Sequence, residues 1–200
     1  MQTAKELFIH ELTDMLDAEQ KLVEALGEME EDDPRPELQK AFGAHRQQTE
    51  GQVERIQQIF QELGEEPEET ECKGIKGLIE ERESFKEEEP AEDILAVFDV
   101  GAAIKVESYE INAYTGLIDL ATELELKKAV KLLNQNLREE QQTLKKMQGF
   151  QKKVKPEQLG NEESEQMEEG AEEQGQQRRS AQRSSGKGQK SQKGRSRRAA

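Results

Sequence analysis

Four stretches of the chain carry mostly apolar residues at alternating spacings of four and three, and this pattern constrains the fold more than any other feature. A long α-helix needs such a stripe to bury one face against other helices. The sequence therefore predicts an all-α protein with four long helices. The stripes are Phe8, Leu12, Met15, Glu19, Leu22, Leu26, Met29; then Leu38, Phe42, His45, Thr49, Gln52, Ile56, Ile59, Leu63; then Val100, Ile104, Glu107, Ile111, Tyr114, Ile118, Ala121; and last Leu126, Val130, Leu133, Leu137, Glu140, Leu144, Met147.

Polar residues interrupt each stripe near the middle of its helix. Glu19, Glu107 and Glu140 stand in three of the stripes, and the second stripe has a polar centre from His45 to Gln52. A buried carboxylate is unfavourable unless a partner compensates it. At a rise of 1.5 Å per residue each helix is about 40 Å long, and the midpoints of antiparallel helices lie at one level. We therefore expect the interruptions to meet in one layer, where a pair of metal ions is the usual occupant of clustered carboxylates.

Local signals place the ends of the helices. Thr3 and Glu6 form a capping-box pattern before the first helix, and Gly64 is a C-terminal stop after the second. A long connection, residues 64–90, separates the second and third long helices, whereas the other connections are short. One long crossover is typical of ferritin-like bundles, so the predicted fold is a ferritin-like four-helix bundle with a short extra helix in this crossover. The expected helices are 4–31, 36–63, 75–86 (the short one), 91–123 and 126–151.

The composition changes sharply near residue 156. Residues 157–175 hold eight glutamates and no basic residue, whereas residues 176–200 hold nine Lys or Arg and no acidic residue. Neither segment has enough apolar residues to bury a core. We therefore predict a bundle domain over residues 1–155 and a disordered tail over 156–200. Without the tail the net charge is −16, against −15 for the whole chain.

Charge and cysteine content exclude several classes of protein. No run of apolar residues is long enough to span a membrane, and the N-terminus has no signal pattern. The single cysteine, Cys72, excludes an internal disulfide and a thiolate metal cluster. We expect a cytoplasmic protein whose acidic bundle does not bind nucleic acid or anionic lipid; a high-salt habitat is another explanation of the acidity.

The polar layer offers mostly oxygen ligands. Glu110 follows Glu107 by one helical turn, so both reach the same region, and His45, Gln48 and Gln52 share one face of the second helix. Oxygen-rich sites suit hard ions such as Fe or Mn. The predicted metal-site residues are Glu19, Glu107, Glu110, Glu140, His45, Gln48 and Gln52, with Tyr109 and Tyr114 as nearby hydrogen-bonding groups.

Two alternatives need no metal. Each glutamate could lie at the edge of its stripe, with its carboxylate in water, or a basic residue such as Lys105, Arg46 or Arg138 could pair with it. His45 could likewise be a core histidine with its hydrogen bonds satisfied. These alternatives differ from the metal site in how deeply the glutamates and His45 are buried and in which groups form hydrogen bonds or ion pairs with them.

Several segments, taken in order, resemble the YciE/YciF family of ferritin-like proteins over roughly residues 4–152. The resemblance implies a ferritin-like bundle, often dimeric, with a proposed dinuclear metal site and a link to stress responses. It points to Glu19, Glu107, Glu110 and Glu140 as ligands, the same four acids that the predicted polar layer contains. The segments are Leu7–Leu12 with Asp17–Leu22, His45 with Gln48–Ile56, Glu71–Glu80, Lys105–Ile111 with Tyr114, and Leu137–Thr143.

The chain departs from the family pattern at two positions. Gln48 stands where the family usually has a glutamate, and Ser108 stands where it usually has a histidine. The leading hypothesis is a ferritin-like protein with an Fe or Mn site that handles metal or oxidants under stress. Whether it is an enzyme stays open, since peroxide or oxygen consumption is an analogy from the fold. The alternative is a non-catalytic helical dimer whose basic segment, residues 176–200, contacts nucleic acid through phosphates.

Overall fold

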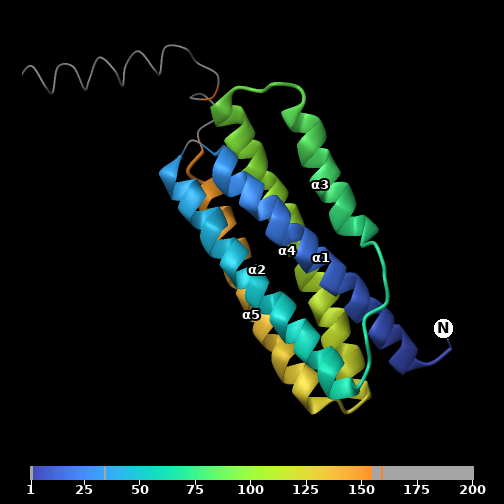
Figure 1. Ribbon diagram of the computed structural model, residues 1–200. Coiled ribbons are helices and arrows are strands. Elements are labelled where there is room, and N and C mark those ends of the chain that lie inside the picture. The colour runs from blue at the N-terminus through green and yellow to red at the C-terminus, as the bar shows by residue number, and fades with distance from the viewer. Residues whose placement is uncertain (1, 34, 155–158, 160–200) are drawn as a thin grey trace, which may run out of the picture. The chain divides into compact units, whose positions relative to one another are not determined.

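The computed structural model describes residues 2–33, 35–154 and 159, and the part described is all-helical, as predicted. Its helices follow the predicted ranges closely. Figure 1 shows the four long helices side by side, with the short α3 on one flank of the bundle. The helices are α1 (Ala4–Asp32), α2 (Pro36–Leu63), α3 (Lys73–Lys86), α4 (Glu92–Glu123) and α5 (Lys127–Gln151).

The chain direction reverses between consecutive long helices except across the crossover. The helix pairs α1–α2 and α4–α5 are antiparallel, and α1 packs on α4 as α2 packs on α5. The crossover carries the chain back along the bundle, so α2 and α4 run in the same direction (Figure 1). This connectivity is that of the ferritin-like bundle predicted from the spacing of the helices.

Hydrogen bonds at the helix ends confirm the local signals. The Thr3 side chain accepts from the backbone N–H of Glu6, and the Glu6 side chain accepts from the backbone of Thr3. Gly64 adopts the left-handed conformation with φ of 65° and ends α2. A residue without Cβ reaches this region at little cost, which explains the stop.

The turn between α4 and α5 is made without glycine. Glu125 has φ of 57°; its N–H donates to the carbonyl of Thr122 at 3.0 Å, and the N–H of Leu126 donates to that of Ala121 at 2.9 Å. This pair of bonds is the Schellman motif, which normally has glycine at the left-handed position. No Gly or Pro marks this turn in the sequence, because a glutamate occupies the left-handed position.

Replacing Glu125 by Gly should therefore stabilise the protein. The left-handed conformation costs a residue with Cβ about 1–2 kcal/mol, and part of this gain is lost to the greater freedom of glycine in the unfolded chain. We expect the free energy of unfolding to rise by about 0.5–1 kcal/mol, measured by urea denaturation. Glu123→Gly, in the last turn of α4, is the matched control and should be destabilising.

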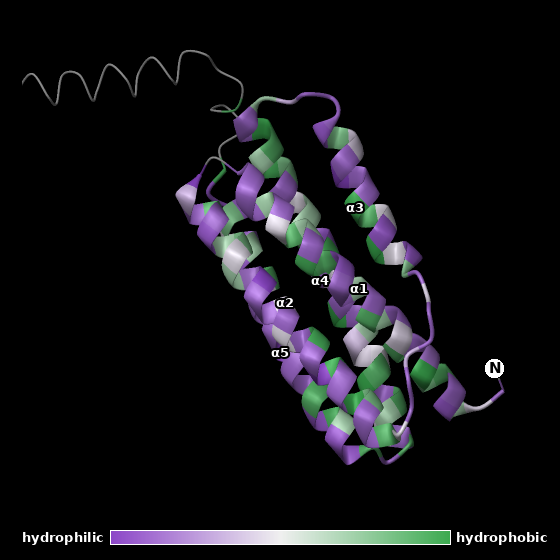
Figure 2. Cartoon of the chain, viewed as in Figure 1, coloured by the Kyte–Doolittle hydropathy of each residue, from purple (hydrophilic) through white to green (hydrophobic). Residues whose placement is uncertain are grey.

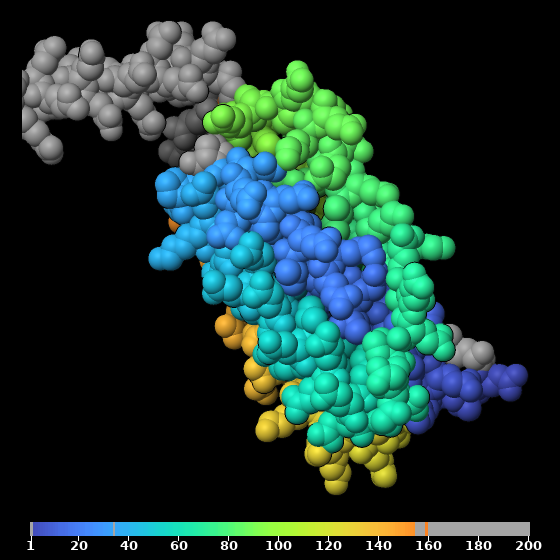
Figure 3. All heavy atoms as spheres, viewed as in Figure 1, coloured from blue at the N-terminus to red at the C-terminus, as the bar shows by residue number. Residues whose placement is uncertain are grey.

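Helix α3 covers the side of the bundle formed by α1 and α4. Figure 3 shows the crossover and α3 lying along α1, and α3 also packs on α4. Arg82 is 3% exposed and its Nε lies 2.9 Å from Oδ1 of the buried Asp99. The Phe85 and Phe98 rings stack with centroids 4.0 Å apart. These contacts fix α3 on the bundle.

The apolar core is divided into two clusters by a polar layer. One cluster contains Phe8, Leu12 and Met15 of α1, and the other contains Leu26 and Met29 of the same helix. On α5 the fully buried Glu140 lies between Leu133 of the first cluster and Met147 of the second. Hydrophilic residues cover much of the outward surface of the helices in Figure 2, so the buried acids are an exception to the general pattern of this chain.

The predicted stripes are correct for α1 and nearly so for α2, but the deepest face is displaced on α4 and α5. On α5 four of the six buried positions are taken by small or polar residues, and the predicted Val130, Leu137 and Leu144 are only partly buried. An apolar stripe drifts around a straight helix with 3.6 residues per turn, and larger side chains flank the polar layer here. The buried α5 residues are Ala129, Leu133, Asn136, Glu140, Thr143 and Met147; those of α4 include Ala103, Glu107, Glu110, Tyr114 and Leu117, with Ile104, Ile111 and Ile118 partly buried.

Two further predictions concern membrane-spanning helices and the C-terminal tail. None of the helices in the described ranges combines the length and apolar character needed to cross a membrane. The predicted tail, with its acidic and basic halves, lies outside the described residues, so the domain boundary at 155 stays a prediction.

Candidate metal centre

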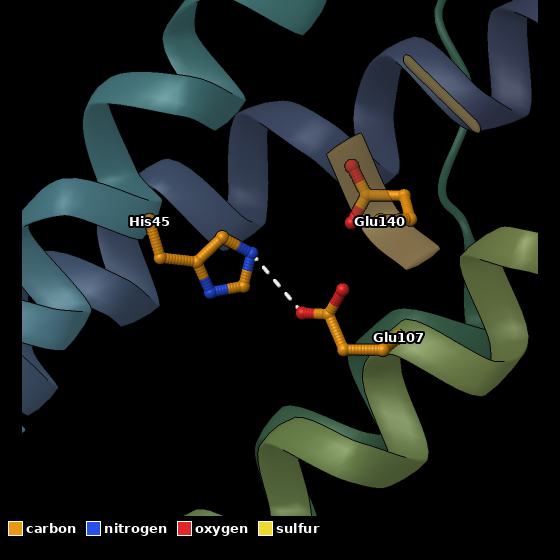
Figure 4. Close-up of side chains that lie close together, drawn as sticks. All are labelled: His45, Glu107 and Glu140. Atoms are coloured by element: carbon orange, nitrogen blue, oxygen red, sulfur yellow. Dashed lines mark ion pairs between the residues drawn. The ribbon is translucent and has the colours of Figure 1, made fainter. Parts of the chain in front are cut away.

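Three ligand-type side chains from three different helices converge inside the bundle. His45 comes from α2, Glu107 from α4 and Glu140 from α5, and one ligand atom of each lies within 4.8 Å of the others. Figure 4 shows the three side chains pointing toward one another. Each is at most 5% exposed. The predicted alignment of the helix midpoints therefore does bring these residues together.

His45 and Glu107 are close without forming an ordinary ion pair. The His45 Nε2 lies 3.1 Å from Oε1 of Glu107, yet this oxygen has no hydrogen bond of acceptable geometry. Burial and, to a smaller extent, the charge of Lys146 lower the pKa of His45 to about 4. The imidazole is therefore neutral at neutral pH, and a neutral imidazole is the form that binds metal.

Glu140 is held from one side by an amide. The Gln52 Nε2 donates to Oε1 of Glu140, while Oε2 of Glu140 has no partner. Burial raises the pKa of Glu140 to about 7, with the neighbouring Glu107 carboxyl group and the hydrogen bond from Gln52 acting in the opposite direction. For Glu107 burial and the neighbouring Glu140 raise the pKa to about 11. Both carboxyl groups are thus in a setting that disfavours their charge.

Glu19 and Glu110 add two more buried carboxyl groups to the layer. They are 0% and 1% exposed. Burial raises the pKa of each well above the usual glutamate value, and the charge of Glu140 raises both further. The alternative in which the acids reach water is therefore wrong for these residues. Four acids share one dry layer, so each raises the cost of ionising the others.

Two of the three basic residues named from the sequence as possible partners of the acids, Lys105 and Arg46, pair elsewhere. The Lys105 Nζ binds Glu81 at 2.6 Å, and Arg46 contacts Glu30 and Glu50 on the surface. Lys105 lies on α4 with two of the acids, and Arg46 lies on α2 next to His45, but both side chains point outward. The ion-pair alternative is not realised by either of them.

A hydrogen-bonded chain that the sequence did not reveal leads from the layer toward the surface. The Tyr114 hydroxyl donates to Oε1 of Glu19, and Asn136 donates from Nδ2 to the same hydroxyl at 2.8 Å. The Asn136 Oδ1 accepts from Nε of Arg55, which also pairs with Glu139. Asn136 lies one turn before Glu140 on the same helix face, so the i, i+4 spacing was the available signal.

The other residues named from the sequence have different surroundings. Gln48 is half-buried and its Nε2 donates to the Thr143 hydroxyl at 3.0 Å rather than to a carboxylate. Tyr109 lies 3.3 Å from Sγ of the buried Cys72. Ser108 is exposed and donates to the carbonyl of Ile104, so the family departure at this position lies outside the buried layer.

The strongest feature of the layer is its set of unpartnered atoms. A buried polar atom without a partner costs about 1–3 kcal/mol, and more if charged. Such atoms in native structures call for an explanation such as a missing ion. Within the described residues, the layer leaves these buried atoms without a hydrogen bond: Oε2 of Glu19, Nδ1 of His45, Oε1 of Gln52, both carboxylate oxygens of Glu107, Oε1 of Glu110 and Oε2 of Glu140.

Sequence and structure comparisons place the chain among known proteins. The family model described as "Domain of unknown function (DUF892)" matches residues 3–160. Protein YciF of Escherichia coli (strain K12) is 38% identical over 144 residues, which are 72% of this chain and 87% of YciF.

Solved structures give the same relationship. The crystal structure of the E. coli stress protein YciF matches with a TM-score of 0.72 at 36% identity, covering 76% of this chain and 96% of that one. YcfI of Rhodopseudomonas palustris, proposed to be a structural protein, matches with a TM-score of 0.71 at 35% identity, covering 74% and 94%. A protein of Xanthomonas campestris pv. campestris shares the fold at 16% identity, with a TM-score of 0.61 and coverage of 75% and 92%. A helical bundle of this connectivity, matched along most of its length by these relatives, shows that the chain belongs to the YciE/YciF family of ferritin-like proteins, the family of the DUF892 domain.

Proposed function

We propose that the buried layer binds one or two Fe or Mn ions and that the protein handles metal or oxidants under stress. The observation that carries this proposal is the set of buried carboxylate and imidazole atoms without hydrogen-bonding partners. Four carboxyl groups in one dry layer repel one another when ionised. A divalent cation would remove this repulsion and would use the free lone pairs as ligands.

The donor set fits hard cations. His45, Glu107 and Glu140 already lie within 4.8 Å of one another, and Glu19 and Glu110 supply two further carboxylates. Carboxylates with one imidazole suit Fe or Mn better than softer metals. Bound Fe or Mn would supply Lewis-acid and redox chemistry toward small oxidants such as peroxide.

Neighbouring side chains would orient the ligands. Gln52 holds Oε1 of Glu140 and Tyr114 holds Oε1 of Glu19, which leaves the other oxygen of each carboxylate free. Hydrogen bonds to the far side of a ligand fix its orientation and raise metal affinity. The name of the related E. coli stress protein supports a role in stress, and we place that role in the cytoplasm.

Elemental analysis tests the proposal. Full-length protein purified without chelator from Fe- or Mn-rich medium should retain about one or two ions per chain. Glu107→Gln keeps the shape of the side chain but removes its charge, so it should weaken binding by more than about 100-fold. Glu54→Gln, exposed on α2, is the matched control and should retain metal like the wild type. Metal that stays far below one ion per chain in the wild type would contradict the proposal.

A second candidate function is a non-catalytic homodimer whose residues 176–200 bind nucleic acid. The nine basic residues of this segment favour it, and the description of the related YcfI as a structural protein is compatible with it. Retention on DNA should then fall steeply with salt, because phosphate contacts release counterions. Deleting residues 176–200 should abolish the retention, and sedimentation should give a dimer.

A further inference from the structure

A cavity of about 170 Å³ lies between α2 and α5 and reaches the candidate metal centre at His45. It runs from exposed residues at the surface to His45 and Thr143, which are buried. A side chain of the metal cluster therefore lines the inner end of the cavity, and the outer end is open to solvent. The lining residues are Ala44, His45, Gln48, Gln142, Thr143 and Lys146.

The lining is rich in hydrogen-bonding groups and contains no carboxylate, although the chain as a whole carries a net charge of −15. The Gln48 amide donates to the Thr143 hydroxyl at 3.0 Å, and this hydroxyl donates to the carbonyl of Glu139 at 3.2 Å. His45 contributes a buried Nδ1 that has no partner. Its other ring nitrogen, Nε2, faces Glu107 (Figure 4), so the cavity borders the metal cluster at the His45 ring.

Positive charge marks the outer part of the cavity. Lys146 is exposed and lines the cavity, and its charge acts on His45 at the inner end. Partial desolvation lowers the pKa of Lys146, and the nearby Lys40 lowers it further. Two lysines in this place disfavour the entry of a metal cation by this route, and they favour an anion.

We propose that this cavity admits a small inorganic anion and holds it against the His45 side of the metal centre, between Lys146 and the polar groups of Gln48 and Gln142. The inference rests on the proposed metal-binding function and adds a class of ligand to it. The cavity volume suits an anion of a few atoms. An apolar ligand would leave the amide groups and Lys146 without partners, which is unfavourable.

Azide is the probe, and the protein is the full-length chain loaded with Co²⁺, whose visible spectrum reports a change in its ligands or in the surroundings of a ligand such as His45. Azide titration of the wild type should give a saturable spectral change. Lys146→Met should weaken azide binding about tenfold, the effect of one nearby charge at a partly solvated site. Ala44→Phe, at an exposed position of the lining, should fill the outer cavity and weaken it by at least as much. Lys145→Met, an exposed neighbour outside the lining, should leave the azide affinity within about twofold of the wild type.

Cobalt content, measured for every variant, separates the two proposals. If the wild type retains cobalt but shows no azide response, or if azide binds equally to the wild type, Lys146→Met and Ala44→Phe, the anion site is wrong and the metal site stands. If the wild type retains no cobalt, iron or manganese, the proposed function fails and the anion site fails with it. A loss of cobalt in Lys146→Met or Ala44→Phe would also count against the anion site, because neither residue belongs to the proposed ligand set.

Discussion

Replacing Glu107 by Gln is expected to make the metal-free protein more stable while it removes the stabilisation by metal. In the folded protein burial raises the pKa of Glu107 to about 11, against 4.5 for an ordinary glutamate. At pH 7 folding must therefore protonate this group, which costs about 1.4 kcal/mol for each of the roughly 2.5 pH units above 4.5. Glutamine is neutral and avoids the cost, so the free energy of unfolding should rise by about 3 kcal/mol.

The measurements are urea denaturation and thermal denaturation, each in the presence of a chelator and, separately, with excess Mn²⁺. A domain of this size gains about 2–4 °C in melting temperature for each kcal/mol, so the variant should melt about 6–12 °C higher without metal. A metal at 100 times its dissociation constant stabilises the wild type by about 2.7 kcal/mol, and the variant should gain far less. Glu54→Gln on the surface should change stability by less than about 0.5 kcal/mol.

This combination of effects is specific to a buried binding site. A glutamate that served only the fold would lose its interactions on substitution and would destabilise the protein. A lower stability of metal-free Glu107→Gln would therefore mean that Glu107 has a favourable partner in the native state.

The metal-free protein should also lose stability as the pH rises from 6.5 to 8. Glu107 and Glu140, with pKa values raised to about 11 and about 7, bind more protons in the folded state than in the unfolded state above pH 4.5. The slope of stability against pH is therefore negative. Glu140 contributes to this negative slope up to about pH 7, and Glu107 contributes to it over the whole range. Each protonated acid adds about 1.4 kcal/mol per pH unit.

His45 acts in the opposite direction but in a different range. Its folded pKa is lowered to about 4 from 6.5, so it destabilises the folded state only as the pH falls below 6.5. Measurements above pH 6.5 therefore isolate the acids. Glu107→Gln should reduce the negative slope by about 1.4 kcal/mol per pH unit. With Mn²⁺ present the slope should become less negative or change sign to positive values, because metal binding displaces protons. A flat profile for the metal-free wild type would show that the acids are already ionised and compensated.

The helices and most of the buried polar layer could be predicted from the sequence, because the signals that form and end a helix act between residues close together in the chain. The 4–3 spacing, the capping box at Thr3 and the stop at Gly64 act within a few residues of the chain, so the ends of α1 and α2 were placed to within about one residue. Interrupted stripes likewise pointed to Glu19, Glu107 and Glu140, because a charged residue in an apolar seam conflicts with burial. The turn at Glu125 carried no such signal, since its left-handed conformation is set by the bond from Leu126 to Ala121.

The sequence by itself determined that the chain forms long amphipathic helices with acids at matching heights, because periodicity and capping depend on neighbours along the chain. Only the tertiary structure decided how each helix is rotated, and this rotation put Asn136 and Thr143 inside, turned Gln48 toward Thr143, and left Val130 and Leu137 at the edge. It also decided that Lys105 and Arg46 point away from the acids. The physical reason is that a helix of 3.6 residues per turn presents several nearly equivalent faces, and only packing against the other helices selects which one is buried.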